Sequence, residues 1–318
     1  MKYSGIGGQA VIEGIMMMKG EDYAVAVRRP DKEIEVKKDT YQSITKKAKI
    51  LQLPFVRGVF RFADSMIIGM RSLTYSASFF EDDEDAEPGK FEQFLDRVFG
   101  EKLESAIMAA VLVISFILAI GIFILLPLGI ANLFKGVITS DHLMAVLEGV
   151  IRIAIFIIYI KLVSRMEDIR RTFMYHGAEH KCINCVEHGH PLTVKYVRES
   201  SKEHKRCGTS FILIVMIISI LMFMVIRVDT IWLRMLSRII LVPVIAGISY
   251  EVLQCAGRSN SKFMDLVSRP GMWMQGLTTK EPDDSMIEVA IAATEAVFDW
   301  REYLTENFPG WEKQLEES

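Results

Sequence analysis

The histidines and cysteines of this chain are concentrated in one short stretch. Five of the six histidines lie between residues 176 and 204, and three of the four cysteines lie between residues 182 and 207. Imidazole nitrogen and thiolate sulfur are the ligands that zinc and related divalent metals take in proteins. The sequence therefore predicts a metal site in this stretch.

Within this stretch, His176-Gly177-Ala178-Glu179-His180 forms the pattern H-x-x-E-H. On a helix, this spacing puts both imidazoles on one face, one turn apart, with the carboxylate beside them. Two neutral imidazoles can bind Zn²⁺ while an unligated glutamate takes a proton from metal-bound water, whose pKa the metal lowers to roughly 7. We therefore predict His176 and His180 as metal ligands and Glu179 as the general base.

Such a site needs a third ligand, and several residues could supply it. His204 and Cys207 precede an apolar segment and are the first candidates. Glu251 lies near the end of another apolar segment, where an unpaired carboxylate is costly, so it is either a ligand or paired with a nearby arginine. Further candidates just downstream of the H-x-x-E-H pattern are Cys185, Glu187 and His188.

Two other patterns are weaker. Cys182 and Cys185 form C-x-x-C, but a four-thiolate zinc site would need a second close pair, and only Cys207 is near. A mixed Cys/His structural zinc site remains an alternative. The glycines at positions 5, 7, 8 and 14 are not followed by Gly-Lys-Ser/Thr, so we do not expect a phosphate loop or nucleotide binding.

The apolar residues are gathered in blocks, although 24% of the chain is charged and 51% is hydrophobic. Residues 106–126 are uncharged over 21 positions, which is about 31 Å of helix and matches the hydrocarbon thickness of a bilayer. Three further spans are expected at 143–163, 207–226 and 235–253. Glu148 and Arg152 in the second span can pair at i,i+4 and should face protein, and Pro243 should kink the fourth.

Basic residues predict the orientation of these spans. Residues 164–206 contain nine lysines and arginines, whereas residues 127–142 contain only Lys135. The basic side is expected to be cytoplasmic, so both termini of this multi-pass protein should lie there, in a bacterial cytoplasmic membrane. The thiols on that side should remain reduced, without structural disulfides. A net charge of −3 gives no reason to expect nucleic acid as a partner.

The polar segments contain four further expected elements. Residues 23–27 and 33–37 alternate as two strands around a turn at 29–32, and residues 55–70 form an amphipathic helix that should lie at the membrane interface. An acidic run at 81–87 is expected to be a linker. Residues 286–300 have a helical pattern after a cap at 283–285.

We therefore predict a membrane α-helical protein with about four transmembrane helices, a small N-terminal cytoplasmic β element and a cytoplasmic His/Cys-containing unit. The expected segments are a β-containing segment at 1–54, an interfacial helix and acidic linker at 55–105, a first transmembrane pair at 106–163, a His/Glu/Cys loop at 164–206, a second transmembrane pair at 207–253 and a C-terminal segment at 254–318.

Four ordered motifs together resemble one family. They are residues 7–17 (GGQAVIEGIMM), 175–181 (YHGAEHK), 204–211 (HKRCGTSF) and 273–282 (WMQGLTTKEP). The chain resembles the YqhQ-like family of bacterial membrane proteins over nearly its whole length. That family is a domain of unknown function described as a predicted metal-dependent enzyme, so the resemblance implies a multi-span membrane protein but no substrate.

The resemblance also implies which positions matter. Cys182 departs from the family pattern, which often has an aliphatic residue there, and His188 and His190 lie outside it. The resemblance thus favours a site made from His176, His180 and His204, with Cys207 or Glu13. The positions that match the family pattern are Glu13, His176, Glu179, His180, Asn184, Cys185, Glu187, His204, Cys207 and Glu281.

Two functions of different classes follow from these residues. The first is a metal-dependent hydrolase, with zinc as the favoured divalent metal, that acts at the cytoplasmic interface on a lipid-linked or membrane-peptide substrate. The second is a non-enzymatic accessory or scaffold subunit of a membrane protein complex, in which metal or hydrogen bonds hold the cytoplasmic unit together. A closed four-ligand metal site would favour this second function. A transporter is less favoured because the sequence contains no internal repeat of usable period.

Overall fold

The computed structural model describes residues 2–80, 103–204, 207–226, 230–258 and 261–315. The chain divides into two compact units. Unit 1 comprises residues 1–80, 159–218 and 240–318, and unit 2 comprises residues 81–158 and 219–239. The expected acidic linker at 81–87 lies outside the described residues.

Unit 1 begins with four antiparallel strands joined in sequence order. They are β1 (Ile6–Val11), β2 (Gly14–Lys19), β3 (Asp22–Arg28) and β4 (Ile34–Thr40). The expected hairpin at 23–27 and 33–37 is confirmed as β3 and β4, which pair Tyr23 with Asp39 and Val25 with Lys37. Strands β1 and β2 were not expected from the sequence.

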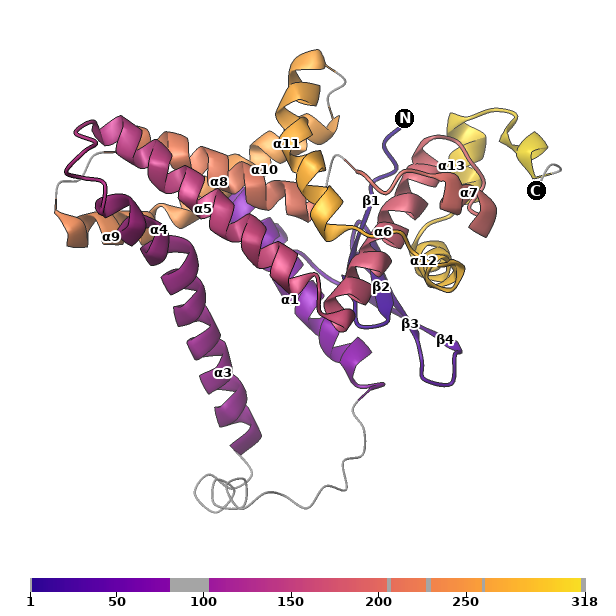
Figure 1. Ribbon diagram of the computed structural model, residues 1–318. Helices are drawn as coiled ribbons and strands as arrows, with labels where there is room; N and C mark the ends of the chain where they lie inside the picture. Colours follow the sequence, from indigo (N-terminus) through magenta and orange to yellow (C-terminus); the bar gives the residue numbers. More distant parts are fainter. Residues whose placement is uncertain (1, 81–102, 205–206, 227–229, 259–260, 316–318) are drawn as a thin grey trace. The chain divides into compact units, whose positions relative to one another are not determined.

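Helices cover both faces of this sheet (Figure 1). On one face, Ile15, Met17 and Ala26 pack into a core with α6 (Glu167–Glu187) and α12 (Asp284–Val297). On the other face, Met16 and Val25 pack against α1 (Val56–Ala77). Because neighbouring residues of β2 point to opposite faces, and both faces are covered, its apolar run is continuous rather than alternating.

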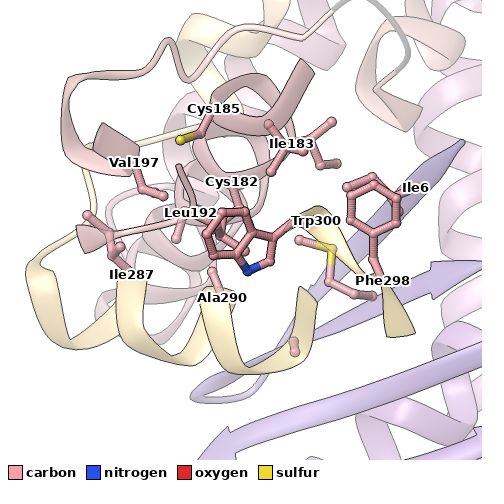
Figure 2. Close-up of a cluster of buried hydrophobic side chains, with 14 of the residues drawn as sticks. Ile6, Cys182, Ile183, Cys185, Leu192, Val197, Ile287, Ala290, Phe298 and Trp300 are labelled. Atoms are coloured by element: carbon pink, nitrogen blue, oxygen red, sulfur yellow. The ribbon is translucent and has the colours of Figure 1, made fainter. Parts of the chain in front are cut away.

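The core on the α6 and α12 side extends into the C-terminal segment (Figure 2). Asp283 caps α12 by accepting a hydrogen bond from the Met286 N–H, which confirms the expected helix start. The helix ends before Phe298, and Asp299 caps α13 (Trp300–Asn307). Trp300 is buried beside Cys182 in this core. The short helices α7 (Val194–Glu199) and η5 (Trp311–Gln314) complete this side.

The residues expected as a polar loop at 164–206 are largely helical. Helix α6 occupies 21 of them, and its segment from Tyr175 to Glu187 is buried except for the partly exposed His176. Polar side chains can be buried at this density because each finds a partner. Lys181, for example, donates to the carbonyl oxygens of Arg198 and Ser200 at 2.8 and 2.9 Å.

Within the described residues, four helices are long and apolar enough to cross a membrane, which confirms the expected number. Their spanning segments are Val113–Asn132, Asp141–Val163, Gly208–Val225 and Met235–Ala256. The first lies later than the expected 106–126. The helix continues from α3 (Leu103–Ile120) through a π-helical turn (Gly121–Leu125) into α4 (Leu126–Asn132), so Pro127 does not end it. A π-turn changes the hydrogen-bond register, which is one way to accommodate a missing N–H.

The other spanning segments belong to α5 (Asp141–Val163), α8 (Gly208–Val225), α9 (Ile231–Ile240) and α10 (Val242–Arg258). The fourth is interrupted at Leu241, and Pro243 lies in the first turn of α10, where proline is well tolerated. Helix α11 (Lys262–Thr278) follows.

Unit 2 contains the charged pair expected in the second span. Glu148 and Arg152 are joined at 2.7 Å, and Glu148 is 4% exposed. Arg238 also donates to Glu148, at 2.5 Å, and Arg152 donates to Ser219. The pair faces protein, as expected, and its further partners belong to this same chain.

The interfacial helix expected at 55–70 is α1, which is longer than expected and packs along α10. Gly58 and Gly247 allow this approach, since a side chain at Gly247 would come within 2.4 Å of the Phe55 carbonyl oxygen. Phe55 itself has a positive φ of 66°. That α1 lies flat at a membrane interface remains a prediction.

Candidate metal centre

Helix α6 brings the two histidines of the H-x-x-E-H pattern together. The ring centroids of His176 and His180 are 4.4 Å apart, at an interplanar angle of 64°. This is the arrangement expected from their i,i+4 spacing. The helix therefore supplies two imidazoles to one point.

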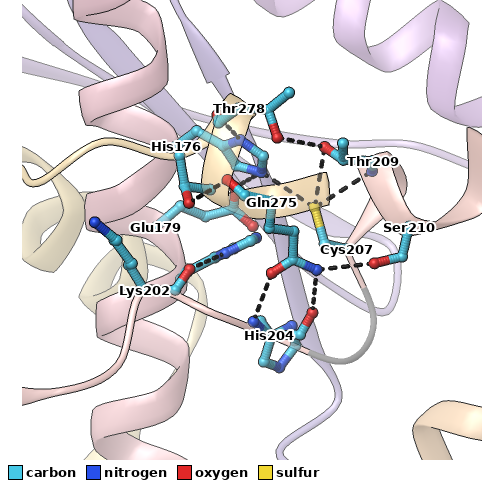
Figure 3. A network of polar contacts seen from close by, with 11 residues as sticks. His176, Glu179, Lys202, His204, Cys207, Thr209, Ser210, Gln275 and Thr278 are labelled. Atoms are coloured by element: carbon cyan, nitrogen blue, oxygen red, sulfur yellow. Dashed lines mark hydrogen bonds and ion pairs between the residues drawn. The ribbon is translucent and has the colours of Figure 1, made fainter. Parts of the chain in front are cut away.

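Cys207 supplies a third donor atom at the same point. It immediately precedes α8, and its Sγ lies 3.2 Å from His176 Nε2 (Figure 3). One ligand atom each from His176, His180 and Cys207 lie within 4.8 Å of one another. Ligands of one tetrahedral zinc ion, bonded at about 2.0–2.3 Å, are roughly 3.3–3.8 Å apart. The donor set and its spacing therefore fit a divalent metal, with small adjustments of the side chains.

Both imidazoles are oriented for ligation through Nε2. His176 Nδ1 lies 3.0 Å from the carbonyl oxygen of Thr278, and His180 Nδ1 lies 2.6 Å from that of Lys202. A backbone carbonyl oxygen can only accept a hydrogen bond, so Nδ1 carries the hydrogen in each ring. Neutral imidazole then leaves the Nε2 lone pair free for a metal. Such outer hydrogen bonds are typical of metal-binding histidines.

Glu179 is buried beside these ligands. Its side chain is 6% exposed, and Oε2 lies 4.0 Å from His176 Nε2. Burial raises the pKa of Glu179 to about 6, although the electrostatic effect of the neighbouring His176 and a hydrogen bond from the Gly8 backbone oppose the shift. A carboxyl group with a pKa near neutrality can both accept and release a proton under physiological conditions.

The segment that carries Cys207 is held by Gln275 of α11. The side chain of Gln275 is fully buried; its Oε1 accepts from the His204 N–H at 2.8 Å, and its Nε2 donates to the His204 carbonyl oxygen at 2.7 Å. Nε2 also donates to Ser210 Oγ. The side-chain amide of Gln275 thus binds His204 and Ser210, which lie on either side of Cys207 in the sequence. Helix α11 therefore holds Cys207 in position relative to α6 (Figure 3).

His204 itself is placed next to the centre rather than in the three-residue group. Its ring centroid is 5.6 Å from that of His180, and its Nε2 lies 3.8 Å from Glu187 Oε2. Glu187 is fully buried and accepts from the Ser4 N–H and hydroxyl at 3.0 and 2.8 Å. The structure thus brings these two predicted residues together, with Glu187 facing His204 and Ser4.

The remaining candidates from the sequence have partners away from the three ligands. Cys185 Sγ donates to the carbonyl oxygen of Pro191 at 3.3 Å, and burial raises the pKa of this thiol to about 12. Cys182 is buried in the apolar core, so the two thiols of C-x-x-C do not form a pair at the centre. His188 is exposed and bonds the Asn184 carbonyl oxygen.

Three of the predicted carboxylates are paired with cations. Glu13 forms a bidentate ion pair with Arg171, with both contacts at 2.5 Å. Glu281 pairs with Lys181 at 2.7 Å and with Lys202 at 3.3 Å. Glu251 pairs with Arg57 at 2.6 Å. For Glu251, the structure therefore matches the salt-bridge alternative rather than the metal-ligand one.

Reasoning from residue types missed Gln275, Thr278 and Gly8. Gln275 contributes a side-chain amide that binds His204, Thr278 contributes a backbone carbonyl oxygen, and Gly8 contributes the space left by its missing side chain. Residue spacing does not reveal contributions of these kinds. All three do lie inside motifs quoted above, at residues 7–17 and 273–282. The resemblance was the signal that could have indicated them.

Comparison with known proteins assigns the chain to a family. The family model described as a protein of unknown function (DUF1385) matches residues 53–300. The chain belongs to the DUF1385 family. The match includes His176, Glu179, His180, Cys207 and Gln275.

A relative outside this chain supports the same conclusion. The uncharacterized protein YqhQ of Bacillus subtilis (strain 168) is 35% identical over 286 residues, which cover 90% of this chain and 89% of the relative. The expected kinship with bacterial YqhQ-like proteins is thereby confirmed. No solved structure matches this DUF1385 chain.

Proposed function

We propose that this DUF1385 protein is a membrane-associated, metal-dependent hydrolase whose metal is held by His176, His180 and Cys207. One observation carries the proposal: three donor atoms lie within 4.8 Å of one another, with the buried carboxyl group of Glu179 beside them. Zinc is the favoured ion because nitrogen and sulfur ligands suit it. The bound metal would supply Lewis acidity at this point.

The number of ligands favours a catalytic centre. Catalytic zinc sites commonly have three protein ligands and one open position, whereas structural sites are closed by four. The described residues place three donors in the group. Substrate or water would occupy the remaining position.

Glu179 acts as the general base in this proposal. Its Oε2 lies 4.0 Å from His176 Nε2, the atom that would bind the metal. A water molecule bound at the centre would therefore be close enough to Glu179 for proton transfer. Glu179 would accept a proton from that water and would later donate it to the leaving group. The carbonyl oxygens of Thr278 and Lys202 would keep the Nε2 lone pairs of both histidines available to the metal, so that Glu179 would be the base left free beside the centre.

The substrate class follows from the membrane-spanning helices. A hydrolase anchored by four apolar helices meets substrates at the bilayer surface, so we propose an ester or amide bond in a lipid-linked molecule or a membrane peptide. The basic residues at 164–206 support a cytoplasmic position for the centre.

Burial favours a second candidate function, an accessory subunit with a structural metal. His180 is 1% exposed and Cys207 is 6% exposed, which is typical of a site that stabilises a fold. His204, beside His180, could close such a site as a fourth ligand after a change of side-chain position.

Metal content tests the centre itself. We expect full-length protein purified in detergent to hold one metal ion per chain, and His176→Ala/His180→Ala to hold none. His188→Ala is the matched control, because His188 is exposed and bonds only within its own helix end, and it should retain the metal. Folded wild-type protein that binds no zinc, iron, manganese or cobalt would overturn the proposal.

Cobalt substitution separates the two functions. With Co²⁺ in the centre, azide or a hydroxamate should change the visible d–d absorption, because the open position admits a further ligand. A spectrum of four-coordinate Co²⁺ that none of these ligands changes would support the accessory subunit instead. The same titration on Glu179→Gln should still show ligand binding, since Glu179 is not among the three donors.

A further inference from the structure

A cavity lies in unit 1, on the face of the sheet opposite to α6. It has a volume of about 480 Å³ and is bounded by β3, β4 and the C-terminal half of α1. Its polar lining includes Lys37, Asp39, Arg71 and Ser72, and its apolar lining includes Met70. The metal centre uses none of these residues.

Two cations of this cavity converge from different elements. Lys37 projects from β4 on the face that carries Val25, its neighbour in register, and its Nζ lies 4.7 Å from the ring centroid of Tyr75. Arg71 of α1 lies over the ring of Tyr41, at 5.7 Å. Asp39 is the one acidic residue of the lining, and both cations act on it electrostatically. The lining therefore has one positive charge in excess.

Ser72 gives this cavity an unused hydrogen-bond donor. Its side chain is 1% exposed, and its hydroxyl has no hydrogen-bond partner within the part of the chain that the structure describes. A buried hydroxyl without a partner costs about 1–3 kcal/mol, so a ligand that accepts its hydrogen bond would recover that free energy.

Apolar side chains on α1 lead from this cavity along the helix. Met66, Met70 and Leu73 follow one another at helical spacing and are 56%, 51% and 38% exposed. Met70 belongs both to this stripe and to the cavity lining. A molecule with an anionic head and an apolar tail would fit the cavity and the stripe together.

We propose that this cavity binds the phosphate group of an anionic membrane lipid, with Lys37 and Arg71 as the cationic contacts and Ser72 as a hydroxyl donor. The acyl chains would lie along the apolar stripe of α1. A free phosphate ion would use the same head-binding groups but not the stripe, so the source of the phosphate can be tested.

The test uses full-length protein in a nonionic detergent and follows the thermal unfolding midpoint. Soluble dihexanoyl phosphatidylglycerol should raise the midpoint of wild-type protein with a saturable dose dependence, which gives a dissociation constant. Dihexanoyl phosphatidylcholine should be at least tenfold weaker. Inorganic phosphate as effective as the phosphatidylglycerol would overturn the lipid source.

Ser72→Ala is the sharpest variant. Removing a hydroxyl without a partner should leave the unfolding midpoint of the lipid-free protein unchanged or raised, while the dissociation constant for the lipid rises roughly tenfold. A purely structural serine would show the opposite: a lowered midpoint with unchanged lipid affinity. That result would contradict the proposal.

Charge variants complete the test. Lys37→Met/Arg71→Met should weaken lipid binding by tenfold or more. Lys38→Met is the matched control, because Lys38 follows Lys37 on β4 and points to the opposite face of the sheet. Equal loss of binding in the control and the double variant would show only a diffuse attraction to charge, and would overturn the assigned site.

Discussion

At the scale of single residues, Glu179 lies in an environment unlike that of an ordinary surface carboxylate. It lies against the strand at Gly8 and beside His176, and burial raises its pKa to about 6. The ion pairs of Glu13, Glu251 and Glu281 distinguish these carboxylates from Glu179. Glutamates that are equivalent by residue type thus acquire different chemical properties from their neighbouring residues.

This pKa predicts how metal-free protein responds to pH. The pKa of Glu179 is higher in the folded state than the ordinary value of 4.5, so folding favours the protonated form. Stability from this residue is therefore greatest below pH 4.5 and falls as the pH rises through 6, by about 2 kcal/mol. Chelator-treated wild-type protein and Glu179→Gln should be compared by thermal unfolding between pH 4.5 and 7.

The control for this prediction is the difference between the two proteins, which removes the contribution of all other groups. Glu179→Gln should lose the fall in stability over that pH range and should gain stability relative to wild type at pH 7. Parallel pH profiles of the two proteins would contradict the raised pKa.

At the scale of secondary-structure elements, β1 and α11 position the centre from outside α6. Strand β1 approaches Glu179 so closely that a side chain at Gly8 would come within 2.9 Å of Glu179 Cγ and 2.7 Å of the Met16 carbonyl oxygen. At Gly7, one residue earlier, a side chain would meet nothing within 4 Å. The two adjacent glycines therefore give a matched pair of variants.

We expect Gly8→Ala to destabilise the protein by about 1–3 kcal/mol, because overpacking forces β1 or Glu179 to move. Gly7→Ala should be within about 0.5 kcal/mol of wild type. Thermal unfolding of both variants checks this expectation. Similar midpoints for Gly8→Ala and wild type would show that Glu179 does not pack on β1.

Helix α11 is tested by Gln275→Met, which removes the amide clamp on His204 but keeps the side-chain volume. Because the clamp acts on the segment that carries Cys207, metal affinity should fall 10- to 100-fold. Gly276→Ala is the neighbouring control, since a side chain there meets nothing within 4 Å. Competition with a zinc-binding dye gives both affinities, and an unchanged affinity for Gln275→Met would show that Cys207 is positioned without α11.

At the scale of the whole molecule, the distribution of basic residues predicts on which side of a membrane the centre lies. The charge asymmetry between residues 164–206 and 127–142 predicts the cytoplasmic side for the centre. Alkaline phosphatase, which is active only outside the cytoplasm, should be active when fused after Ile138 and inactive when fused after Ser200. The reverse pattern of activities would place the centre outside the cytoplasm.

The sequence by itself determined the features that depend on local pattern. Four apolar blocks predicted four possible membrane spans. The i,i+4 spacing predicted that His176 lies beside His180 and that Glu148 pairs with Arg152. Asp283 indicated the start of α12. In each case the physical cause is the periodicity or hydrophobicity of a continuous segment. Periodicity and hydrophobicity can be recognised in the sequence without knowing what the segment contacts.

Only the tertiary structure decided which distant residues meet. It placed Cys207 beside His176 and His180. It also placed His204 beside Glu187 and paired Glu251 with Arg57. It also formed β1 and β2 from a segment rich in glycine and methionine, whose strand propensity is low but whose two faces are both covered by helices. These outcomes depend on packing between segments far apart in sequence, and residue type and spacing contain no record of that packing.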